Sequence, residues 1–396
     1  MHVSMFHLMP YQAFDRDYDK RLNSAWITYP NSGFDPKVGH VLYNQYLDEL
    51  ELCEQLGFDG ICVNEHHQTP YGMMPSPIVI ASALARRTTK ANIIILGSAF
   101  CLRQHPLTLA EEHAMLDVIT GGRLISGMVR GVGAEYYSFG VNPTESHERF
   151  HEAHDLVIQA WSRPGPFAFE GKHYHFEYVN VWPRPYQKPH PKIWIPSQGS
   201  TETVEWAAHP DRKYKYVQNF NPYAAIVKYL DSYRDVARRY GYEASSDQLG
   251  WAAPCYVADT DEQAMNEARE PIETLFNKLL RMPPGMFFPP GYTSVESHKR
   301  ITAAKSSIMG ARRTVEQLVE HGVIIVGSPD TVRNKILAAH KQLGFGSFTA
   351  LLQFGTLDHA RTVRNIRRFA ADVLPALQEA GDSHYGGFEP VRQAAQ

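Results

Sequence analysis

Three consecutive titratable side chains follow a short apolar segment near the N-terminus. The stretch DGICVNEHHQTPYG (residues 59–72) passes from aliphatic residues directly to Glu65, His66 and His67. Such a group can ligate a metal, carry out acid–base chemistry, or lie solvated in a loop. A zinc or two-metal site needs three or more ligands that converge from several strand ends. Only His7 can join this group from another predicted strand end, so we expect no catalytic metal, and the other two alternatives stay open.

A second group of residues is suited to an anion. The stretch SQGSTET (197–203) places hydroxyls where a predicted helix follows a strand, so Ser200 and Thr203 can both face a phosphate near free backbone N–H groups. Arg130, in the stretch RGVG, leaves another strand end and can bind a phosphate with two hydrogen bonds, and Arg149 adds a second charge. Each feature alone has a simpler explanation, an N-cap or a tight turn. Together they favour a phosphate site, although the glycines do not form a dinucleotide-binding fingerprint.

Composition places the chain among ordinary globular proteins. Of 396 residues, 43% are hydrophobic and 20% charged, and the net charge of −3 argues against a general attraction to nucleic acid. The four cysteines form no C-x-x-C pair, so we expect buried free thiols. The N-terminus lacks the features of a secretory signal, and the longest aliphatic run, residues 93–96, is too short to cross a membrane. A soluble, cytoplasmic protein is therefore expected.

The elements that must position these residues alternate along the chain. Short, continuously apolar segments are each followed by a helical pattern, which is typical of parallel strands covered by helices. Eight such units favour an α/β fold of the (β/α)8 TIM-barrel type, with residues 1–396 as a single domain. The predicted strands are residues 3–9, 58–64, 92–100, 123–131, 192–198, 213–220, 249–258 and 347–354.

One segment interrupts this alternation. Residues 271–310 contain RMPPGMFFPPGYTSVESHKR, which is rich in proline and aromatic residues. An inserted segment between the seventh and eighth strands emerges on the catalytic rim of a barrel, where long loops often act as lids. A surface loop without function is the alternative.

The motifs, taken in order, resemble those of the bacterial luciferase-like family of flavin-dependent monooxygenases. They are FDGICVNEHHQTPYG (58–72), MLDVITGGRLISGMVRG (115–131) and GSTETVEWAA (199–208), and the resemblance extends to the closing helix at 355–377. The resemblance implies a (β/α)8 barrel, FMN bound in its reduced form (FMNH2), O2 as cosubstrate and a separate flavin reductase as a transient partner. It also implies a homo-oligomer, most simply a dimer.

The resemblance also assigns roles to individual residues. His66 matches the catalytic histidine, as a general base or as a group that stabilises the flavin hydroperoxide. Glu65, before it, either orients His66 or anchors a neighbouring loop, and His67 is expected to be structural. The end of the third strand matches the place where the family has a non-proline cis peptide beneath the flavin ring. The expected flavin-binding residues are Ser98, Ala99, Val129, Arg130, Arg149, Gly199, Ser200 and Thr203.

The substrate is less closely determined. Aromatic residues and methionines on or after strand ends suggest an apolar or aromatic organic molecule, although half of them are equally explained as packing of the rim. The favoured function is insertion of one oxygen atom from O2 into this substrate. Hydride transfer from the deazaflavin F420, and flavin binding without turnover, are the alternatives. The residues considered are Tyr71, Met73, Met74, Phe100, Tyr136, Tyr137, Trp194 and Phe220.

Overall fold

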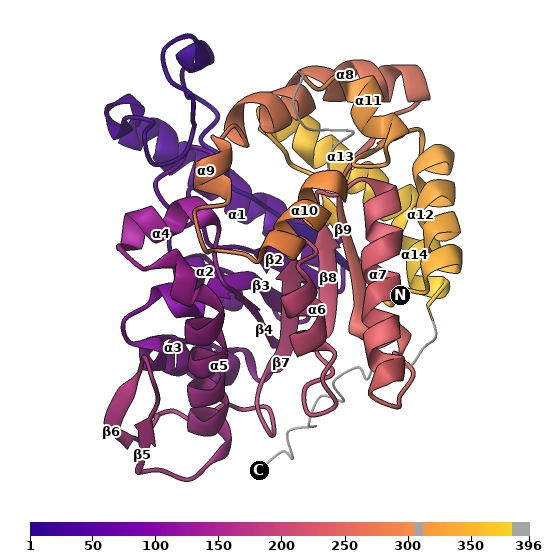
Figure 1. The fold of residues 1–396 in the computed structure, drawn as a ribbon. Helices are drawn as coiled ribbons and strands as arrows, with labels where there is room; N and C mark the ends of the chain where they lie inside the picture. The colour runs from indigo at the N-terminus through magenta and orange to yellow at the C-terminus, as the bar shows by residue number, and fades with distance from the viewer. Residues whose placement is uncertain (305–311, 382–396) are drawn as a thin grey trace.

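Eight parallel strands close into a barrel, as predicted (Figure 1). The structure is a computed structural model that describes residues 1–304 and 312–381. Neighbouring strands pair in the order β1-β2-β3-β4-β7-β8-β9-β11, and pairing of β11 with β1 closes the ring. The strands are β1 (His2–Phe6), β2 (Gly60–Val63), β3 (Asn92–Ala99), β4 (Leu124–Val129), β7 (Lys192–Ser197), β8 (Lys215–Asn219), β9 (Leu249–Val257) and β11 (Ser347–Leu351).

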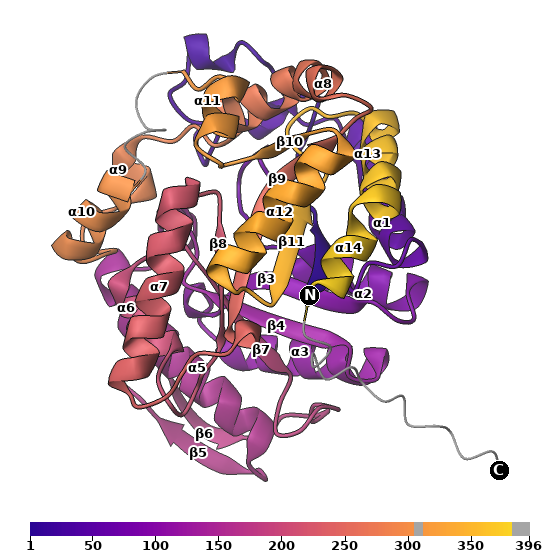
Figure 2. The ribbon, with the colours of Figure 1, turned by 90° about the vertical axis from the view of Figure 1, so that its right-hand side faces the viewer.

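Helices surround the barrel on its outer side (Figure 2). Their ends follow from local sequence: the Ser328 hydroxyl caps α12 by accepting the Thr331 N–H, and Gly121 ends α3 in the left-handed conformation. The long helices are α1 (Pro36–Gln55), α2 (Pro77–Arg87), α3 (Pro106–Thr120), α5 (Ser146–Ser162), α7 (Tyr223–Arg239), α8 (Asp261–Thr274), α12 (Pro329–Leu343) and α13 (His359–Asp372). The shorter helices are α4 (Gly133–Phe139), α6 (Thr201–Ala207), α9 (Pro284–Phe287), α10 (Val295–Ala304), α11 (Val315–Glu320) and α14 (Leu374–Glu379), together with 3-10 turns at Tyr18–Lys20, Asn31–Gly33, Phe100–Leu102, Pro143–Glu145 and Ser246–Gln248.

The barrel interior is closed by side chains that alternate along each strand. His2 faces the interior, because its ring lies 6.0 Å from that of Trp194 on β7, on the opposite wall. The pairing register of β1 with β2 and β11 places Asn64 and Gln353 on the same side as His2, but beyond the other end of the strands. All four cysteines are buried free thiols, as predicted. Among the described residues, no helix is long and apolar enough to cross a membrane.

Three short strands were not predicted from the sequence. β5 (Phe167–Glu170) and β6 (His175–Val179) form an antiparallel hairpin within the polar, proline-rich stretch at 162–191. β10 (Ile325–Gly327) pairs with β9 outside the closed ring, and its three residues are too few to give a pattern.

The predicted insertion begins later and is more helical than its composition indicates. α8 passes through Pro271 to Thr274 and continues as a π-helix, η6 (Leu275–Leu279), because buried apolar side chains on this face outweigh the cost of the proline. The segment then forms α9, which lies beside α4 (Figure 1), and α10, which lies beside α6 in both views (Figures 1 and 2). Its predicted position on the rim is therefore confirmed up to residue 304. Residues 305–311 and 382–396 lie outside the described part, so the single domain over 1–396 stays a prediction.

Candidate functional site

Bulky residues with positive backbone φ angles gather where the chain leaves the C-terminal ends of the strands. Met9, Gln68 and Phe220 follow β1, β2 and β8 with φ of 51°, 53° and 49°. Ile27, with φ of 48°, donates its backbone N–H to Gln68 O. Side chains rarely adopt this region, and such residues are most often found at functional sites. Lys213, with φ of 48°, precedes β8 at the opposite end of the barrel, but four of the five such residues in the described part of the chain lie at this mouth and favour it as the functional end.

His66 is fixed on several sides at this mouth. Its Nδ1 lies 3.0 Å from Glu135 Oε1, and its side chain is 16% exposed. The rings of Trp26 and Tyr71 each meet the imidazole edge-on, with centroids 5.1 Å away. Trp26 in turn donates its indole N–H to Leu279 O, in the π-helix at the base of the insertion. The imidazole is therefore held in one orientation by a carboxylate and two aromatic walls.

Glu135 determines which nitrogen of His66 carries the proton. Its side chain is 1% exposed, and its second oxygen, Oε2, accepts the Val132 N–H at 2.7 Å. A carboxylate can only accept hydrogen bonds, so His66 Nδ1 is the donor, and in the neutral imidazole Nε2 keeps a free lone pair. The sequence analysis missed Glu135. The available signal was its position three residues after Val132, where a glutamate can accept the free backbone N–H at the start of a helix.

Glu65 does not contact His66. Its buried carboxylate accepts hydrogen bonds from His67 at 2.9 Å, Arg103 at 3.1 Å and the backbone N–H of Ala99 at 3.3 Å. Burial alone would raise the pKa of Glu65, but the hydrogen bond from His67 and the charge of Arg103 outweigh it, and the pKa is lowered. Of the two predicted roles, the contacts match anchoring of a neighbouring loop, here the end of β3. His67 serves this network, as a structural residue would.

The end of β3 contains a non-proline cis peptide, two residues earlier than the position matched to the family. The cis bond joins Leu96 and Gly97. A Cβ on Gly97 would lie 2.9 Å from a backbone oxygen of β4 and 3.0 Å from Val129 Cγ1, so the close approach of β3 and β4 requires glycine here. Val129 lies beside this bond. Ser98 instead turns its hydroxyl to a histidine of α3, 3.4 Å away, so this predicted side chain does not face the mouth, whereas Ala99 is held through its backbone N–H by Glu65 and pairs with Val129.

Arg130 lies at the mouth and is covered by the insertion. Its Nη1 donates to Ser146 Oγ at 3.0 Å and to Tyr292 O at 2.7 Å, and its guanidinium lies 4.3 Å from the centre of the Tyr292 ring. The Tyr292 hydroxyl donates to Gly131 O at 2.6 Å. All of these acceptors are neutral.

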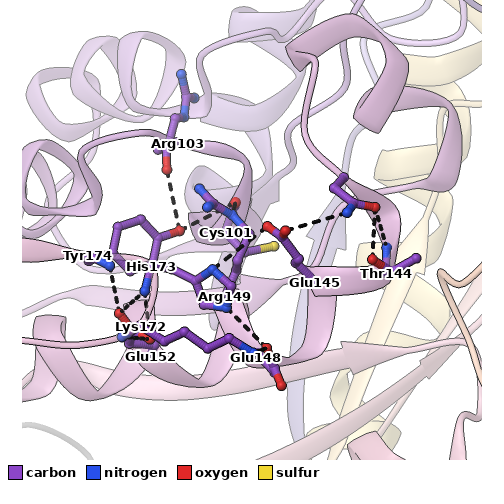
Figure 3. Close-up of polar contacts among 11 residues, drawn as sticks. Cys101, Arg103, Thr144, Glu145, Glu148, Arg149, Glu152, Lys172, His173 and Tyr174 are labelled. Carbon is purple, nitrogen blue, oxygen red and sulfur yellow. Dashed lines mark hydrogen bonds and ion pairs between the residues drawn. The ribbon is translucent and has the colours of Figure 1, made fainter.

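Arg149 lies beside Cys101 (Figure 3). Its Nε donates to Cys101 O at 3.2 Å, and its guanidinium lies 4.9 Å from the centre of the Tyr174 ring, in the turn of the β5–β6 hairpin. The Cys101 thiol donates to Arg130 O at 3.2 Å. Burial raises the pKa of this thiol to about 11, and the charges of Arg130 and Arg149 oppose the rise, so both arginines lie near it.

The loop after β7 forms the start of α6. Ser200 is the N-cap, since its hydroxyl accepts the Thr203 N–H at 3.3 Å, and the two hydroxyl oxygens are 2.6 Å apart. Gly199 has φ of 98°, and a Cβ there would lie 2.3 Å from a ring carbon of Tyr229. The simpler explanation offered for Ser200, an N-cap, is therefore confirmed. Its role toward a phosphate stays a prediction.

The insertion also packs on the start of α6. Ser297 Oγ accepts the Thr201 N–H at 3.1 Å and donates to Glu202 Oε2 at 2.5 Å. Arg300 Nη1 donates to Thr201 Oγ1 at 3.2 Å. Burial and the charge of Arg130 lower the pKa of His147 to about 4, while the charge of Glu202 opposes this, so both charged groups lie near His147. Through these contacts the insertion joins Arg130, Arg300 and α6. From the sequence, this segment was expected to be a lid or a surface loop without function.

Positive charge at this rim is not neutralised by carboxylates. Within residues 1–304 and 312–381, Arg130, Arg149 and Arg300 form no ion pair. Arg300 Nε and His147 Nε2 are buried and have no hydrogen-bond partner in the same part of the chain. Buried polar groups without partners are costly and are usually satisfied by a ligand or water. The residues present therefore fit a phosphate group.

Two amides offer polar contacts inside the mouth. Asn64 Oδ1 and Gln353 Oε1 are buried without a donor among the described residues. Both side chains point into the barrel, so a ligand with hydrogen-bond donors on one edge would satisfy them. A flavin ring has such an edge, and the residues fit it.

Only some of the predicted apolar residues line this mouth. Tyr71 contacts His66, and Phe220 lies half-buried against Phe276 with ring centroids 6.2 Å apart. Trp194 faces the opposite end of the barrel. The others pack elsewhere: Phe100 against a histidine of α3, Tyr136 on Arg130 O, and Tyr137 largely in solvent. The alternative that half of these residues pack the rim is thus the better description.

Comparison with known proteins identifies the family. The sequence model described as luciferase-like monooxygenase matches residues 27–346. The chain belongs to this family. The relatives of this luciferase-like chain include the oxygenase component of the flavin-dependent trigonelline monooxygenase of Acinetobacter baylyi, 22% identical over 87% of this chain and 93% of that protein. The alkanal monooxygenase alpha chain of Aliivibrio fischeri is 24% identical over 82% and 90%. An uncharacterised protein of Sinorhizobium fredii, y4wF, is 36% identical, but the match covers 43% of this chain and 50% of that protein.

Solved structures share the fold of this luciferase-like chain. The monooxygenase RslO1 of Streptomyces bottropensis superimposes with a TM-score of 0.71 at 23% identity, over 95% of this chain and 99% of that one. The oxygenating constituent of 3,6-diketocamphane monooxygenase of Pseudomonas putida, in complex with FMN, gives 0.71 at 20% identity, over 95% and 98%. An F420-dependent secondary alcohol dehydrogenase gives 0.65 at 14%, over 95% and 98%. The family and the relatives bear out the prediction of an oxidoreductase, a flavin-dependent monooxygenase.

Proposed function

We propose that this chain is the oxygenase component of a two-component monooxygenase. It would take FMNH2 from a separate reductase and use O2 to oxygenate an apolar or aromatic organic substrate. The observation that carries the proposal is the short segment that runs from Arg130, directly after β4, to Glu135 in the first turn of α4. One short segment thus joins a cationic rim suited to a phosphate to the carboxylate that orients His66. A flavin mononucleotide needs both a phosphate contact and a polar group near its reactive ring.

The cofactor would be held by residues on several strand ends. Arg130 and Arg149 would carry the charge for its phosphate, with Ser200 and Thr203 as hydroxyl donors, and Gly199, which lets Tyr229 pack against the backbone, would shape the loop before them. Val129 and the cis bond of β3 would face its ring, and the amides of the barrel mouth its polar edge. When bound in reduced form, FMN supplies the electrons for oxygen activation.

This chain's own residues would supply protection and proton transfer. Trp26 and Tyr71 exclude water around His66, which an oxygenating site requires, since water diverts the reaction to peroxide release. His66 Nε2, unprotonated while Nδ1 bonds Glu135, can accept a proton from the substrate and return it later. Phe220 and Phe276 offer an apolar wall that suits an apolar or aromatic substrate.

A homodimer is the proposed assembly, in line with the resemblance. Helices α2 and α3 expose Val79 (66%), Met115 (46%), Val118 (43%) and Ile119 (47%), which is unusual for a face that stays in water. Light scattering of the purified protein tests this: a single species of two chains is expected, and Ile119→Glu should shift it toward one chain. The cytoplasmic location stays a prediction.

The deciding experiment combines the protein with FMN, NADH and a flavin reductase and follows O2 uptake with panels of apolar and aromatic compounds. Substrate-dependent uptake with incorporation of one 18O atom per product is the expected result. His66→Ala should bind FMN as the natural chain does, but yield little product and more hydrogen peroxide. Anaerobic hydride transfer from reduced F420, with no use of FMN, would contradict the proposal and select the alternative.

A further inference from the structure

Helix α10 places an arginine, Arg300, at the rim of the barrel. The resemblance assigns this part of the rim to the cofactor phosphate. Arg130 donates to Tyr292 O, just before α10, and Arg300 reaches Thr201 Oγ1 from within α10. Both figures show α10 beside α6, where the loop from β7 enters (Figures 1 and 2). The motif assignments include neither Arg300 nor any other residue of the insertion.

The hydrogen-bonding capacity of Arg300 is largely unused. A guanidinium has five N–H groups. Among the residues that the structure describes, its acceptor is the neutral Thr201 hydroxyl at 3.2 Å, and the guanidinium lies 5.1 Å from the centre of the Tyr229 ring. Its Nε is buried and, within residues 1–304 and 312–381, has no acceptor and no carboxylate partner. The side chain is therefore held in place by the fold while its charge is left for another group.

Glu202 explains why the segment must be docked for this charge to act on an anion. Burial raises its pKa, but hydrogen bonds from the hydroxyls of Ser294 and Ser297 outweigh this, and the pKa is lowered, so the carboxylate stays charged. An unrestrained carboxylate beside an incoming phosphate would repel it. The two serines belong to the same segment as Arg300. When α10 is docked, hydrogen bonds from Ser294 and Ser297 thus restrain the Glu202 carboxylate, and Arg300 adds a positive charge.

We propose that Arg300 is a third arginine contact for a phosphate monoester at this rim, brought there by α10. The inference rests on the proposed function, in which the phosphate is that of FMN. The inserted segment would then distinguish flavins by their phosphate, because α10 docks more firmly on a flavin that carries the phosphate than on one that lacks it. Arg300 would join Arg130 in holding the dianion.

Affinities for FMN and riboflavin, measured by quenching of flavin fluorescence, test the contact. Loss of one charge-assisted hydrogen bond corresponds to a change of about 10- to 100-fold in Kd. Arg300→Met should raise the Kd for FMN by about that factor and leave the Kd for riboflavin within about twofold. Lys299→Met is the matched control, since Lys299 is the exposed neighbour on the same helix, and it should change neither Kd. Equal losses for both flavins, or no loss for either, would overturn the proposal.

Two further measurements separate this inference from the proposed function. If Arg130→Met weakens FMN and Arg300→Met does not, the phosphate site stands and the role of Arg300 is wrong. If neither substitution affects FMN, both proposals fail. Hydrogen exchange of α10 (Val295–Ala304) should slow with FMN and not with riboflavin. Slowing with millimolar inorganic phosphate but not with FMN would assign the site to a phosphorylated substrate and overturn the inference.

Discussion

Replacement of Glu135 by glutamine should reverse the proton arrangement of His66. The Val132 N–H is held at 2.7 Å by this side chain and must keep an acceptor, so the amide oxygen of the glutamine should take that position. The amide NH2 then faces His66 Nδ1, 3.0 Å away in the present contact. Because an NH2 group can only donate, Nδ1 must become the acceptor and Nε2 must carry the hydrogen. His66 Nε2, the nitrogen that would face the substrate, therefore changes from a hydrogen-bond acceptor to a donor.

The magnitudes follow from the two hydrogen bonds. A bond to a charged group contributes about 1.5–3 kcal/mol and a neutral one about 0.5–1.5, so the free energy of unfolding should fall by about 1–2 kcal/mol. A misplaced general base costs about 10²- to 10⁴-fold in rate. Long-range proton–nitrogen correlations on 15N-histidine protein report the tautomer, urea unfolding reports stability, and product per O2 consumed reports turnover.

A matched control is available in Glu65→Gln, because that carboxylate is also buried but bonds Arg103 and the end of β3 rather than His66. It should alter stability and leave the His66 tautomer unchanged. An unchanged tautomer in Glu135→Gln, with turnover within twofold of the natural chain, would refute the reasoning.

Two other predictions concern stability. Gly199→Ala should lower the free energy of unfolding by about 2–5 kcal/mol, because the residue has a positive φ and its new Cβ would collide with Tyr229. Gly57→Ala, at φ of 91° with open space around it, should lower the free energy of unfolding by only about 1–2 kcal/mol. Equal losses for the two variants in urea titrations would contradict this explanation. The hydrogen bond to buried Glu49 raises the pKa of His359, so this pair should stabilise the fold fully below pH of about 6.5 and lose its effect as pH rises through the raised pKa. The difference in stability between the natural chain and His359→Gln should therefore shrink from pH 5.5 to pH 9, and a constant difference would be evidence against the pair.

The sequence predicted the barrel because its strands are buried on both sides and read as continuous apolar runs. It predicted His66 and Arg130 because both follow such runs directly. It could not predict Glu135 as the partner of His66, since the contact spans 69 residues and depends on how β2 and β4 are placed in the ring. Glu65 was the nearer carboxylate in sequence but lies on the other side of the backbone. The role of Arg300 depends on packing of the insertion, for which composition gave no pattern.

The indole of Trp26 bonds the π-helix from which the insertion departs, and its ring is a wall of the His66 chamber. We therefore expect a displacement of that π-helix to move the ring that contacts the imidazole, although Arg300 and His66 belong to separate parts of the rim. Binding at the proposed phosphate site and the shape of the space around His66 would then depend on each other. An engineered change of substrate preference can therefore be sought in the insertion, without substituting the residues that surround His66.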